Sequence, residues 1–268
     1  MLNKNRFNEI LPSLQKICFE AGALQIKLHD TDLNYVTKEN KTPVTDADIG
    51  SNKILTEGLR LITPEIPIIS EEDYKGQDRH SYFWLIDPLD GTRNYMNKGN
   101  EFCICISLIH NDFPILGFIY SPITQDLYYS YKGIGAYLKK KNNQPIRLYT
   151  KKVNCDQPNI IYTSTSINEN ILHLLANKIY SPKFIKCSSA LKFGYIASGQ
   201  GCFYPRLGPT HEWDTAAGQS LIEEAGGVVV DKFMQPLRYN KNKTFINKEF
   251  FVISDVNYDW KSVIEAIF

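Results

Sequence analysis

Residues 84–92, Trp-Leu-Ile-Asp-Pro-Leu-Asp-Gly-Thr, determine how the rest of this chain is interpreted. The apolar run 83–86 predicts a buried strand that ends at Asp87, because a proline and a glycine interrupt it. The turn that follows holds a second carboxylate, Asp90, and the hydroxyl of Thr92. Two carboxylates this close repel each other unless a cation or shared protons offset the charge, so the turn favours a hard metal ion. A solvated turn is the alternative, since Asp, Pro and Gly are common turn formers.

The composition is that of an ordinary globular protein. The chain has 268 residues, of which 43% are apolar and 22% charged, enough for one large domain or two closely packed ones. The formal net charge is +1, and neither half is dominated by one sign. Nucleic acid polymers are therefore not expected partners. The lysine clusters at 139–141 and 151–152 are interpreted as solvated loop ends, with a weak contact to an anionic surface as the alternative.

Cysteine usage and hydropathy bear on where the protein works. None of the six cysteines is spaced as C-x-x-C, and most lie in apolar or strand-like contexts. No apolar run approaches the roughly 20 residues that span a bilayer, and the N-terminal segment lacks the core of a signal peptide. We therefore expect a reduced, cytoplasmic protein without a transmembrane segment, and leave open a peripheral association with the inner face of the cell membrane.

The first half of the chain combines helices with antiparallel strands. Apolar residues recur at helical spacing over 7–28, and Thr45 begins a capping box that opens a second helix, which Pro64 ends. A short strand over 66–70 precedes the central strand. Three further strand-like runs between 102 and 131 predict an antiparallel meander.

The second half alternates strands with helices, from a strand at 159–162 to a closing helix at 260–267. This pattern predicts an α/β half with parallel pairing. The polar, turn-rich stretch 139–145 is the best candidate for a boundary. We therefore expect residues 1–143 to hold the helix pair and the antiparallel sheet, and residues 144–268 to hold the α/β half with a mixed or parallel sheet.

Acidic residues share one property in this pattern: each follows a strand or opens a helix, where a rigid element can direct it to a common point. They are Asp48, Glu71, Asp87, Asp90 and Asp214. Each has an alternative role as a helix cap or a solvated strand end. No histidine and cysteine cluster has zinc spacing, so a site built from these residues would be all oxygen and would favour Mg²⁺. Phosphoester hydrolysis is the reaction that such a site suits best.

Four segments resemble, in order and spacing, the motifs of the inositol monophosphatase superfamily of lithium-sensitive, magnesium-dependent phosphatases: 44–48, 70–73, 84–92 and 212–218. The likeness covers nearly the whole chain and implies a layered αβαβα sandwich with the site between its halves. Within the superfamily, 189–193 and 204–210 look most like the bacterial CysQ branch, the 3'(2'),5'-bisphosphate nucleotidases of sulfur metabolism.

The resemblance implies two or three Mg²⁺ ions, with ligands assigned by motif to Glu71, Asp87, the carbonyl of Leu89, Asp90 and Asp214. It also implies that Thr92, polarised by Asp48, helps to activate the attacking water. Glu72 would orient water near the same site. By this resemblance residues 1–143 carry most of the ligands, and 144–268 contribute Asp214 and the substrate pocket.

Substrate-binding positions follow from the same resemblance. The phosphate at the metals would contact Glu71, Leu89, Asp90, Gly91, Thr92 and Asp214. A second phosphate or the nucleoside would contact Ser189, Lys192 and Arg206, because a bisphosphate leaves one anion away from the metals. As alternatives, Lys192 could be solvated and Arg206 could pair with a surface acid.

Three departures from the branch pattern bear on the substrate. Asn94 is closer to the inositol phosphatase pattern, and Ser188 stands where a glycine is usual. The segment 163–166, Thr-Ser-Thr-Ser, lacks the cation and the imidazole of the branch's usual S-R-S-H. These changes leave the predicted metal chemistry untouched and weaken the substrate assignment.

The leading hypothesis is a phosphatase that converts adenosine 3',5'-bisphosphate to AMP and phosphate, with 3'-phosphoadenosine 5'-phosphosulfate as a further candidate substrate. The alternative is a phosphatase for inositol monophosphate or another sugar phosphate, motivated by Asn94 and the changed segment 163–166. A non-catalytic magnesium or nucleotide sensor is a third class, but its expected sign, a broken carboxylate set or a missing Thr92, is absent from the sequence. Monomer and homodimer both remain open.

Overall fold

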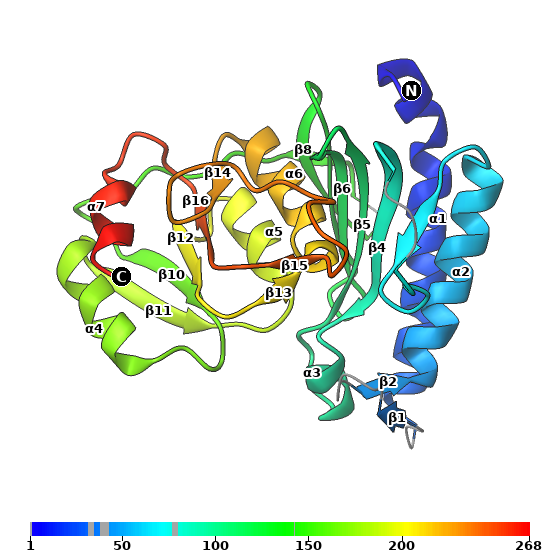
Figure 1. The fold of residues 1–268 in the computed structure, drawn as a ribbon, viewed down its shortest axis with the longest axis horizontal. Helices are drawn as coiled ribbons and strands as arrows, with labels where there is room; N and C mark the ends of the chain where they lie inside the picture. Colours follow the sequence, from blue (N-terminus) through cyan, green and yellow to red (C-terminus); the bar gives the residue numbers. More distant parts are fainter. Residues whose placement is uncertain (1, 32–34, 38–42, 77–79, 142) are drawn as a thin grey trace.

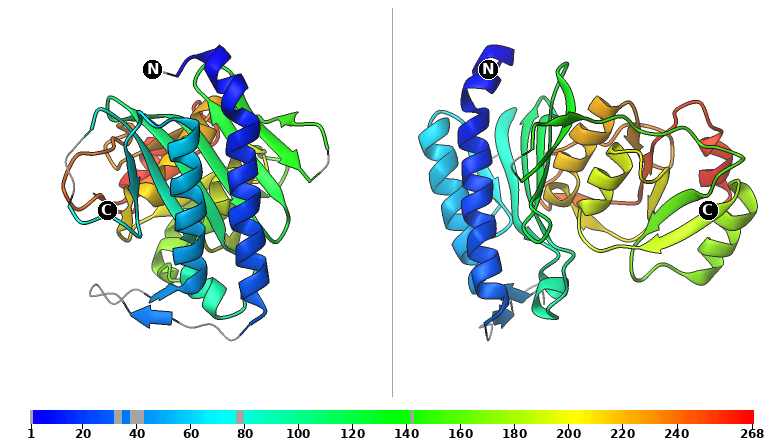
Figure 2. Two further views of the ribbon diagram at one scale, coloured as in Figure 1. Left: turned by 90° about the vertical axis from the view of Figure 1, so that its right-hand side faces the viewer. Right: turned by 180° about the vertical axis from the view of Figure 1, so that it is seen from behind.

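The computed structural model describes residues 2–31, 35–37, 43–76, 80–141 and 143–268. Asn142, in the stretch predicted as a domain boundary, lies outside these residues. The described chain forms five layers, in which helices and sheets alternate (Figures 1 and 2). Three of the buried apolar clusters fill the spaces between layers, so each sheet is covered by helices. This arrangement confirms the predicted α/β fold.

The outer helix layer consists of α1 (Lys4–His29) and α2 (Asp46–Ile62), which lie side by side against one face of the large sheet (Figure 2). The side chain of Asn3 accepts the Arg6 N–H, 3.0 Å away, and so caps α1. The predicted capping box begins α2. In the connection from α1 to α2 along the chain, β1 (Tyr35–Thr37) and β2 (Pro43–Thr45) form a small antiparallel pair.

The large sheet has seven strands in the order β3-β4-β5-β6-β7-β8-β9. Their bounds are Ile68–Ser70, Tyr82–Asp90, Cys103–His110, Phe113–Ser121, Asp126–Tyr131, Gly135–Lys140 and Ile146–Arg147. The predicted meander is confirmed, since β5, β6 and β7 pair antiparallel. The strand β9 follows the predicted boundary at 143 and pairs with β8. The first sheet thus includes a strand that follows residue 143, and the division of the chain at 143 stays a prediction.

Strand β4 corrects one expectation. It was predicted to end at Asp87, but it continues to Asp90, with its pairing to β5 shifted between these two residues. Pro88 lies in the shifted segment, where its missing N–H interrupts no regular pair of hydrogen bonds. A second difference is that β3 pairs with β4 in parallel at the edge of the otherwise antiparallel sheet.

The inner helices α5 (Leu191–Ala197) and α6 (Ala216–Ala225) lie between the two sheets (Figure 1). The second sheet has the order β11-β10-β12-β16-β14, with bounds Pro182–Lys186, Asn159–Thr163, Phe203–Arg206, Phe250–Ile253 and Val228–Val230. Strand β10 is parallel to β11 and β12, and β16 is antiparallel to its neighbours, so the sheet is mixed. Helices α4 (Glu169–Lys178) and α7 (Trp260–Glu265) cover its outer face.

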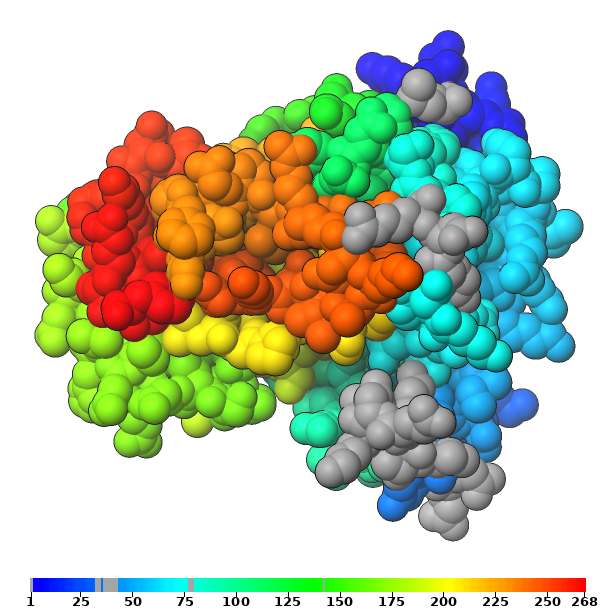
Figure 3. All heavy atoms as spheres, in the orientation of Figure 1, coloured from blue at the N-terminus to red at the C-terminus, as the bar shows by residue number. Residues whose placement is uncertain are grey.

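Short elements near the centre complete the fold. They are α3 (Thr92–Met96), the 3₁₀ turn η1 (Glu212–Asp214), and the pair β13 (Thr210–His211) and β15 (Ile246–Asn247). The helix pair and the second sheet occupy opposite ends of the molecule, and its surface is indented between the light-green residues of the second half and the teal residues around α3 (Figure 3). No helix in the ranges that the structure covers is long and apolar enough to cross a membrane.

Thiol reactivity follows from burial. All six cysteines are free, and five are buried, whereas Cys155 is exposed. Burial raises the pKa of Cys187 and of Cys202 to about 12, so these thiols keep their protons at pH 8, and only the thiolate is nucleophilic. We expect the native protein to react rapidly with a thiol reagent at Cys155 alone, with the others reacting after unfolding. Cys155→Ser should abolish the fast phase of the reaction. Two or more thiols per native chain reacting in the fast phase would contradict this expectation.

Candidate metal centre and active site

The irregular end of β4, Asp-Pro-Leu-Asp at 87–90, which we call the carboxylate turn, is held by the helix layer. The Leu89 N–H donates to Asp87 Oδ1 at 3.0 Å, which fixes the carboxylate against its own turn. The side-chain amide of Gln25 donates to the Pro88 carbonyl at 2.7 Å and to Ser51 Oγ at 3.0 Å. Gln25 is fully buried, so these bonds connect α1, α2 and the turn in an apolar setting. Sequence reasoning missed Gln25, although a polar residue on the apolar face of a helix was a usable signal.

Three acidic side chains from different elements converge beside this turn. Carboxylate oxygens of Glu71, Asp87 and Asp214 lie within 4.8 Å of one another. The parallel edge of the sheet positions Glu71, whose N–H donates to the Ile86 carbonyl at 3.2 Å. Asp214 is oriented by the His211 N–H, which donates to its Oδ2 at 2.9 Å. Residues more than 140 positions apart in the sequence are thus brought together as predicted.

Burial and mutual repulsion disfavour negative charge in this cluster. Burial, together with the charges of Glu71, Asp90 and Asp214, raises the pKa of Asp87 well above its usual range. Burial also raises the pKa of Asp214, with Asp90 and Glu71 adding to the effect. For Asp90, burial raises the pKa while the Lys192 ammonium opposes it. A set of crowded, buried oxygen donors fits a hard divalent cation, because the cation would offset this repulsion.

The converging carboxylates line a cavity of about 290 Å³, which we call the carboxylate cavity. Its lining includes Glu71, Asp87, Leu89, Asp90, Thr92 and Asp214. All five predicted metal-binding residues therefore border one space. Oxygen donors predominate there, and Mg²⁺ prefers such donors together with substrate phosphate.

Thr92 and Asp48 meet at the edge of this cavity. The Thr92 hydroxyl lies 3.1 Å from Asp48 Oδ1 and 3.1 Å from the Leu89 carbonyl, and its single proton can serve one of the two at a time. The other oxygen of Asp48 accepts the N–H and the O–H of Thr45, at 2.7 and 2.5 Å. The helix-cap alternative for Asp48 is therefore correct, and it coexists with the predicted contact to Thr92.

Gly91 occupies a position that other residues fit poorly. Its φ is +98°, in the left-handed region, and an added Cβ would lie 2.8 Å from the Glu101 carbonyl oxygen. The same Cβ would lie 3.3 Å from Cβ of Ser189. Because glycine can adopt this conformation in so little space, α3 can begin at Thr92, directly after Asp90 and Gly91.

A second cavity, of about 210 Å³, adjoins the first, and we call it the cationic cavity. Its lining includes Asp90, Ser189, Lys192, Tyr204, Arg206 and Asp214. Asp90 and Asp214 border both cavities. The structure thus brings the predicted substrate-binding cations next to the carboxylate cluster. Ser164 and Thr165 also line this cavity, so two residues of the segment that departs from the branch pattern border it.

Lys192 is buried, which excludes the solvated alternative. Its side chain is 4% exposed, and Nζ donates to the carbonyls of Cys187 at 3.0 Å and Ser189 at 2.5 Å. Nζ also lies 4.8 Å from the centre of the Tyr204 ring. Two of the three ammonium donors are thus used by the protein, which leaves one for a ligand.

Arg206 lines the same cavity and is held by the loop that follows it. Its guanidinium donates to the carbonyls of Gly208 and Pro209, both at 3.2 Å. Among the described residues, its hydrogen bonds run to carbonyls rather than to a surface acid. Its charge lowers the pKa values of Asp90 and Asp214, against the larger effect of burial.

Glu72 lies in the short turn that follows β3, next to Glu71. It is half-buried, its N–H lies 3.4 Å from Ser70 Oγ, and it lines neither cavity. Asp48 also lines neither cavity, but it reaches the carboxylate cavity through Thr92.

The layered fold and the carboxylate site define a metal-dependent phosphatase. The chain belongs to the inositol monophosphatase family, whose profile matches residues 8–260. This match confirms the family resemblance that the four sequence segments carry.

Its relatives include proteins named 3'(2'),5'-bisphosphate nucleotidase CysQ. The chain is 33% identical to the one from Haemophilus influenzae, over 98% of each chain. It is 37% identical to the one from Buchnera aphidicola, over 92% of this chain and 94% of that protein. Among solved structures, CysQ from Bacteroides thetaiotaomicron superposes with a TM-score of 0.76 at 26% identity, covering 92% of this chain and 98% of the other. The chain shares its fold with an inositol monophosphatase from Thermotoga maritima. The TM-score is 0.79 at 22% identity, over 97% of this chain and 96% of the other.

Proposed function

We propose that this protein is a Mg²⁺-dependent nucleotidase that removes the 3'-phosphate of adenosine 3',5'-bisphosphate to give AMP and phosphate. The observation that carries this proposal is the shared border of the two cavities at Asp90 and Asp214. A bisphosphate needs one site for the phosphate that reacts and a second, cationic site for the phosphate that stays. The names of the relatives support the same substrate class.

In this proposal the metal ligands are Glu71, Asp87, the Leu89 carbonyl, Asp90 and Asp214. Bound among these oxygens, two or three Mg²⁺ ions would supply charge neutralisation for the phosphate and a lowered pKa for the attacking water. Residues 1–143 then carry most of the site, and 144–268 supply Asp214 and the cationic cavity.

The protein's own groups position the water. With its proton donated to Asp48 Oδ1, Thr92 Oγ1, which lines the carboxylate cavity, would accept a hydrogen bond from the attacking water. Asp48 is in turn fixed by its two bonds from Thr45. Backbone N–H groups at the start of α3, after Gly91, would contact the reacting phosphate. Glu72 would act in a supporting position near the same water.

The remaining phosphate would bind in the cationic cavity. Lys192 offers its third donor there, and Arg206 offers the guanidinium N–H groups not used by Gly208 and Pro209. Ser189 is available as a further donor, and the Tyr204 ring provides an apolar surface for the nucleoside.

The inositol phosphatase alternative, motivated by Asn94 and the segment 163–166, is the second candidate function. Asn94, which motivated it, accepts the Glu101 N–H at 2.9 Å and packs against Gly99, where an added Cβ would lie 2.3 Å from Asn94 Oδ1. Asn94 thus holds the connection between α3 and β5, a structural task that requires no inositol.

The deciding experiment measures phosphate release from adenosine 3',5'-bisphosphate and from inositol 1-phosphate, each with and without Mg²⁺. We expect rapid release from the nucleotide only when Mg²⁺ is present. Release from the inositol ester alone would keep the phosphatase and overturn the substrate. Release that does not require Mg²⁺ would overturn the metal assignment.

Arg206→Gln tests the cationic cavity. We expect KM for adenosine 3',5'-bisphosphate to rise about 10- to 100-fold, which corresponds to the loss of one hydrogen bond between charged groups. The value of kcat should change little. Turnover of inositol 1-phosphate should change by less than about twofold, since it has no second phosphate. Lys183→Gln, an exposed lysine on β11, is the matched control. Equal losses on both substrates would contradict the assigned role.

A further inference from the structure

Two core thiols lie directly behind the Asp-Pro-Leu-Asp segment, and the proposed reaction does not use them. In the pairing of β4 with β5, Cys103 is opposite Asp90 and Cys105 is opposite Asp87. Residues two apart on a strand point to the same face, so both thiols face the side of the sheet that carries the site. The two cysteines of the C-x-C sequence on β5 therefore lie opposite the two aspartates of the D-x-x-D sequence on β4.

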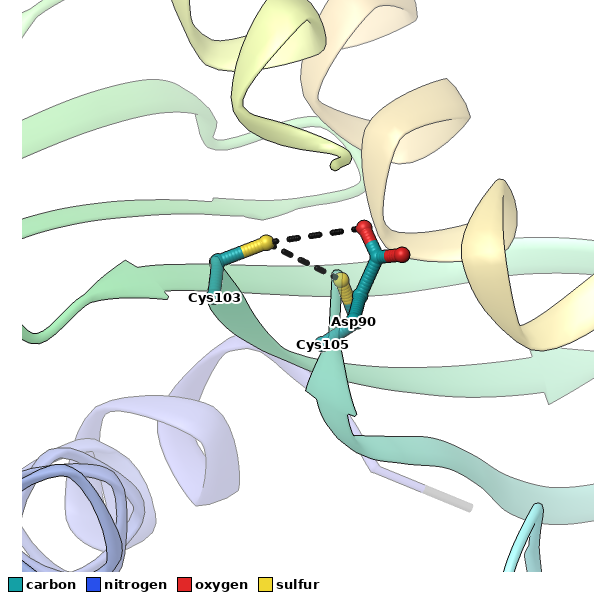
Figure 4. A group of neighbouring side chains, drawn as sticks. All are labelled: Asp90, Cys103 and Cys105. Carbon is teal, nitrogen blue, oxygen red and sulfur yellow. Dashed lines mark hydrogen bonds between the residues drawn. The ribbon is translucent and has the colours of Figure 1, made fainter. Parts of the chain in front are cut away.

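The three side chains are already close to the geometry of a metal site. Cys103 Sγ lies 3.7 Å from Asp90 Oδ2 and 3.9 Å from Cys105 Sγ, and the three point toward one another (Figure 4). Tetrahedral Zn²⁺ bonds of about 2.3 Å to sulfur and 2.0 Å to oxygen separate two sulfurs by about 3.8 Å, and a sulfur from an oxygen by about 3.5 Å. These two separations need to change by only a few tenths of an ångström, and Cys105 Sγ lies within 4.8 Å of an Asp90 carboxylate oxygen.

Access to this group runs through Asp90. Cys103 and Cys105 are almost completely buried, whereas Asp90 is partly exposed and borders both cavities. A cation in the carboxylate cavity can therefore contact the Asp90 carboxylate, and Cys103 lies on the buried side of that carboxylate. The Ala190 N–H also donates to Asp90 Oδ2 and holds it in place.

We propose that Cys103, Cys105 and Asp90 form a binding site for a thiophilic divalent cation of the Zn²⁺ and Cd²⁺ class, separate from the Mg²⁺ ligand set except for Asp90. Thiolates select soft cations, whereas Mg²⁺ prefers oxygen. On binding, two metal–sulfur bonds form and each thiol releases its proton to solvent, with no change in oxidation state. Because Asp90 serves both sites, a soft cation bound here inhibits the enzyme by withdrawing a ligand from Mg²⁺.

The test is a titration of the intact protein with Cd²⁺, followed by ultraviolet sulfur-to-cadmium charge-transfer absorption, which does not depend on activity. We expect the band to saturate at one equivalent, and we expect added Mg²⁺ to weaken Cd²⁺ binding because both ions use Asp90. Absence of the band would overturn the site, and a Cd²⁺ affinity unaffected by Mg²⁺ would overturn the sharing of Asp90.

Variants separate this site from other thiols. Cys105→Ser and Cys105→Val each remove one sulfur without touching Asp90, and should weaken Cd²⁺ binding by at least about 10-fold, with an equal rise in the Cd²⁺ concentration for half-inhibition. Cys202→Ser, which alters a buried thiol directly before β12 of the second sheet, should leave both values unchanged. Wild-type binding in both Cys105 variants would overturn the proposal. If the chain proves inactive on every phosphate ester, the absorption titration still decides the thiol site.

Discussion

Asp90→Asn is expected to lower kcat about 10³-fold or more while the protein stays folded. Loss of one metal ligand removes several kcal/mol of transition-state stabilisation, and each 1.4 kcal/mol is about tenfold in rate. The fold should survive, because the amide oxygen of asparagine can still accept from the Ala190 N–H and the Cys103 thiol. Removing one charge also relieves the repulsion felt by Asp87 and Asp214.

Two measurements check this expectation: kcat at saturating Mg²⁺, and the melting temperature with and without Mg²⁺. The unaltered protein should melt at a higher temperature when Mg²⁺ is added, because a ligand of the native state stabilises it. In Asp90→Asn this increase should shrink, while the melting temperature without metal should equal or exceed that of the unaltered protein. Asp156→Asn, in an exposed turn, is the control. Near-normal activity, or unfolding without metal, would contradict the role given to Asp90.

Thr92→Val should reduce kcat about 10²- to 10⁴-fold, the usual range for a group that positions or transfers a proton in the reaction. Valine keeps the shape of threonine but removes the hydroxyl that lies 3.1 Å from Asp48 Oδ1. The increase in melting temperature caused by Mg²⁺ should remain, since the side chain of Thr92 is not among the proposed metal ligands. This pattern separates Thr92 from Asp90.

Thr92→Ser is the matched control because it restores the hydroxyl. It should retain activity within about tenfold of the unaltered protein, the loss reflecting the greater freedom of the unbranched side chain. A valine variant as active as the serine variant would show that the hydroxyl has no part in the chemistry. KM should change little in either variant, since the effect falls on the reacting step.

The sequence predicted the elements in which the apolar residues follow a clear pattern along the chain. Helix α1 repeats its apolar residues at helical spacing, and β5, β6 and β7 are apolar runs separated by turn residues, buried on both faces. The convergence of Glu71, Asp87 and Asp214 was predictable because each residue ends or begins a rigid element. The continuation of β4 to Asp90 was not, because only its pairing with β5 shows that the chain remains in the sheet after Pro88.

What the sequence missed depends on contacts between distant residues. The ammonium of Lys192 bonds to carbonyls only three and five residues earlier in the chain, but its burial depends on how the rest of the fold packs around that loop. Gln25 supports Pro88 from a helix 63 residues earlier in the chain. The thiols of β5 are recognisable as part of the site only when the register opposite Asp87 and Asp90 is known.

The two oxygens of Asp48 perform different tasks, since one closes the capping box of α2 and the other contacts Thr92. Local unfolding of the first turn of α2 would therefore release Thr92 from its partner while both sheets remain intact. Helix ends open at lower free energy than sheet cores. As denaturant is added, inactivation should thus precede the loss of global structure, so that the enzyme stops working before it exposes its core.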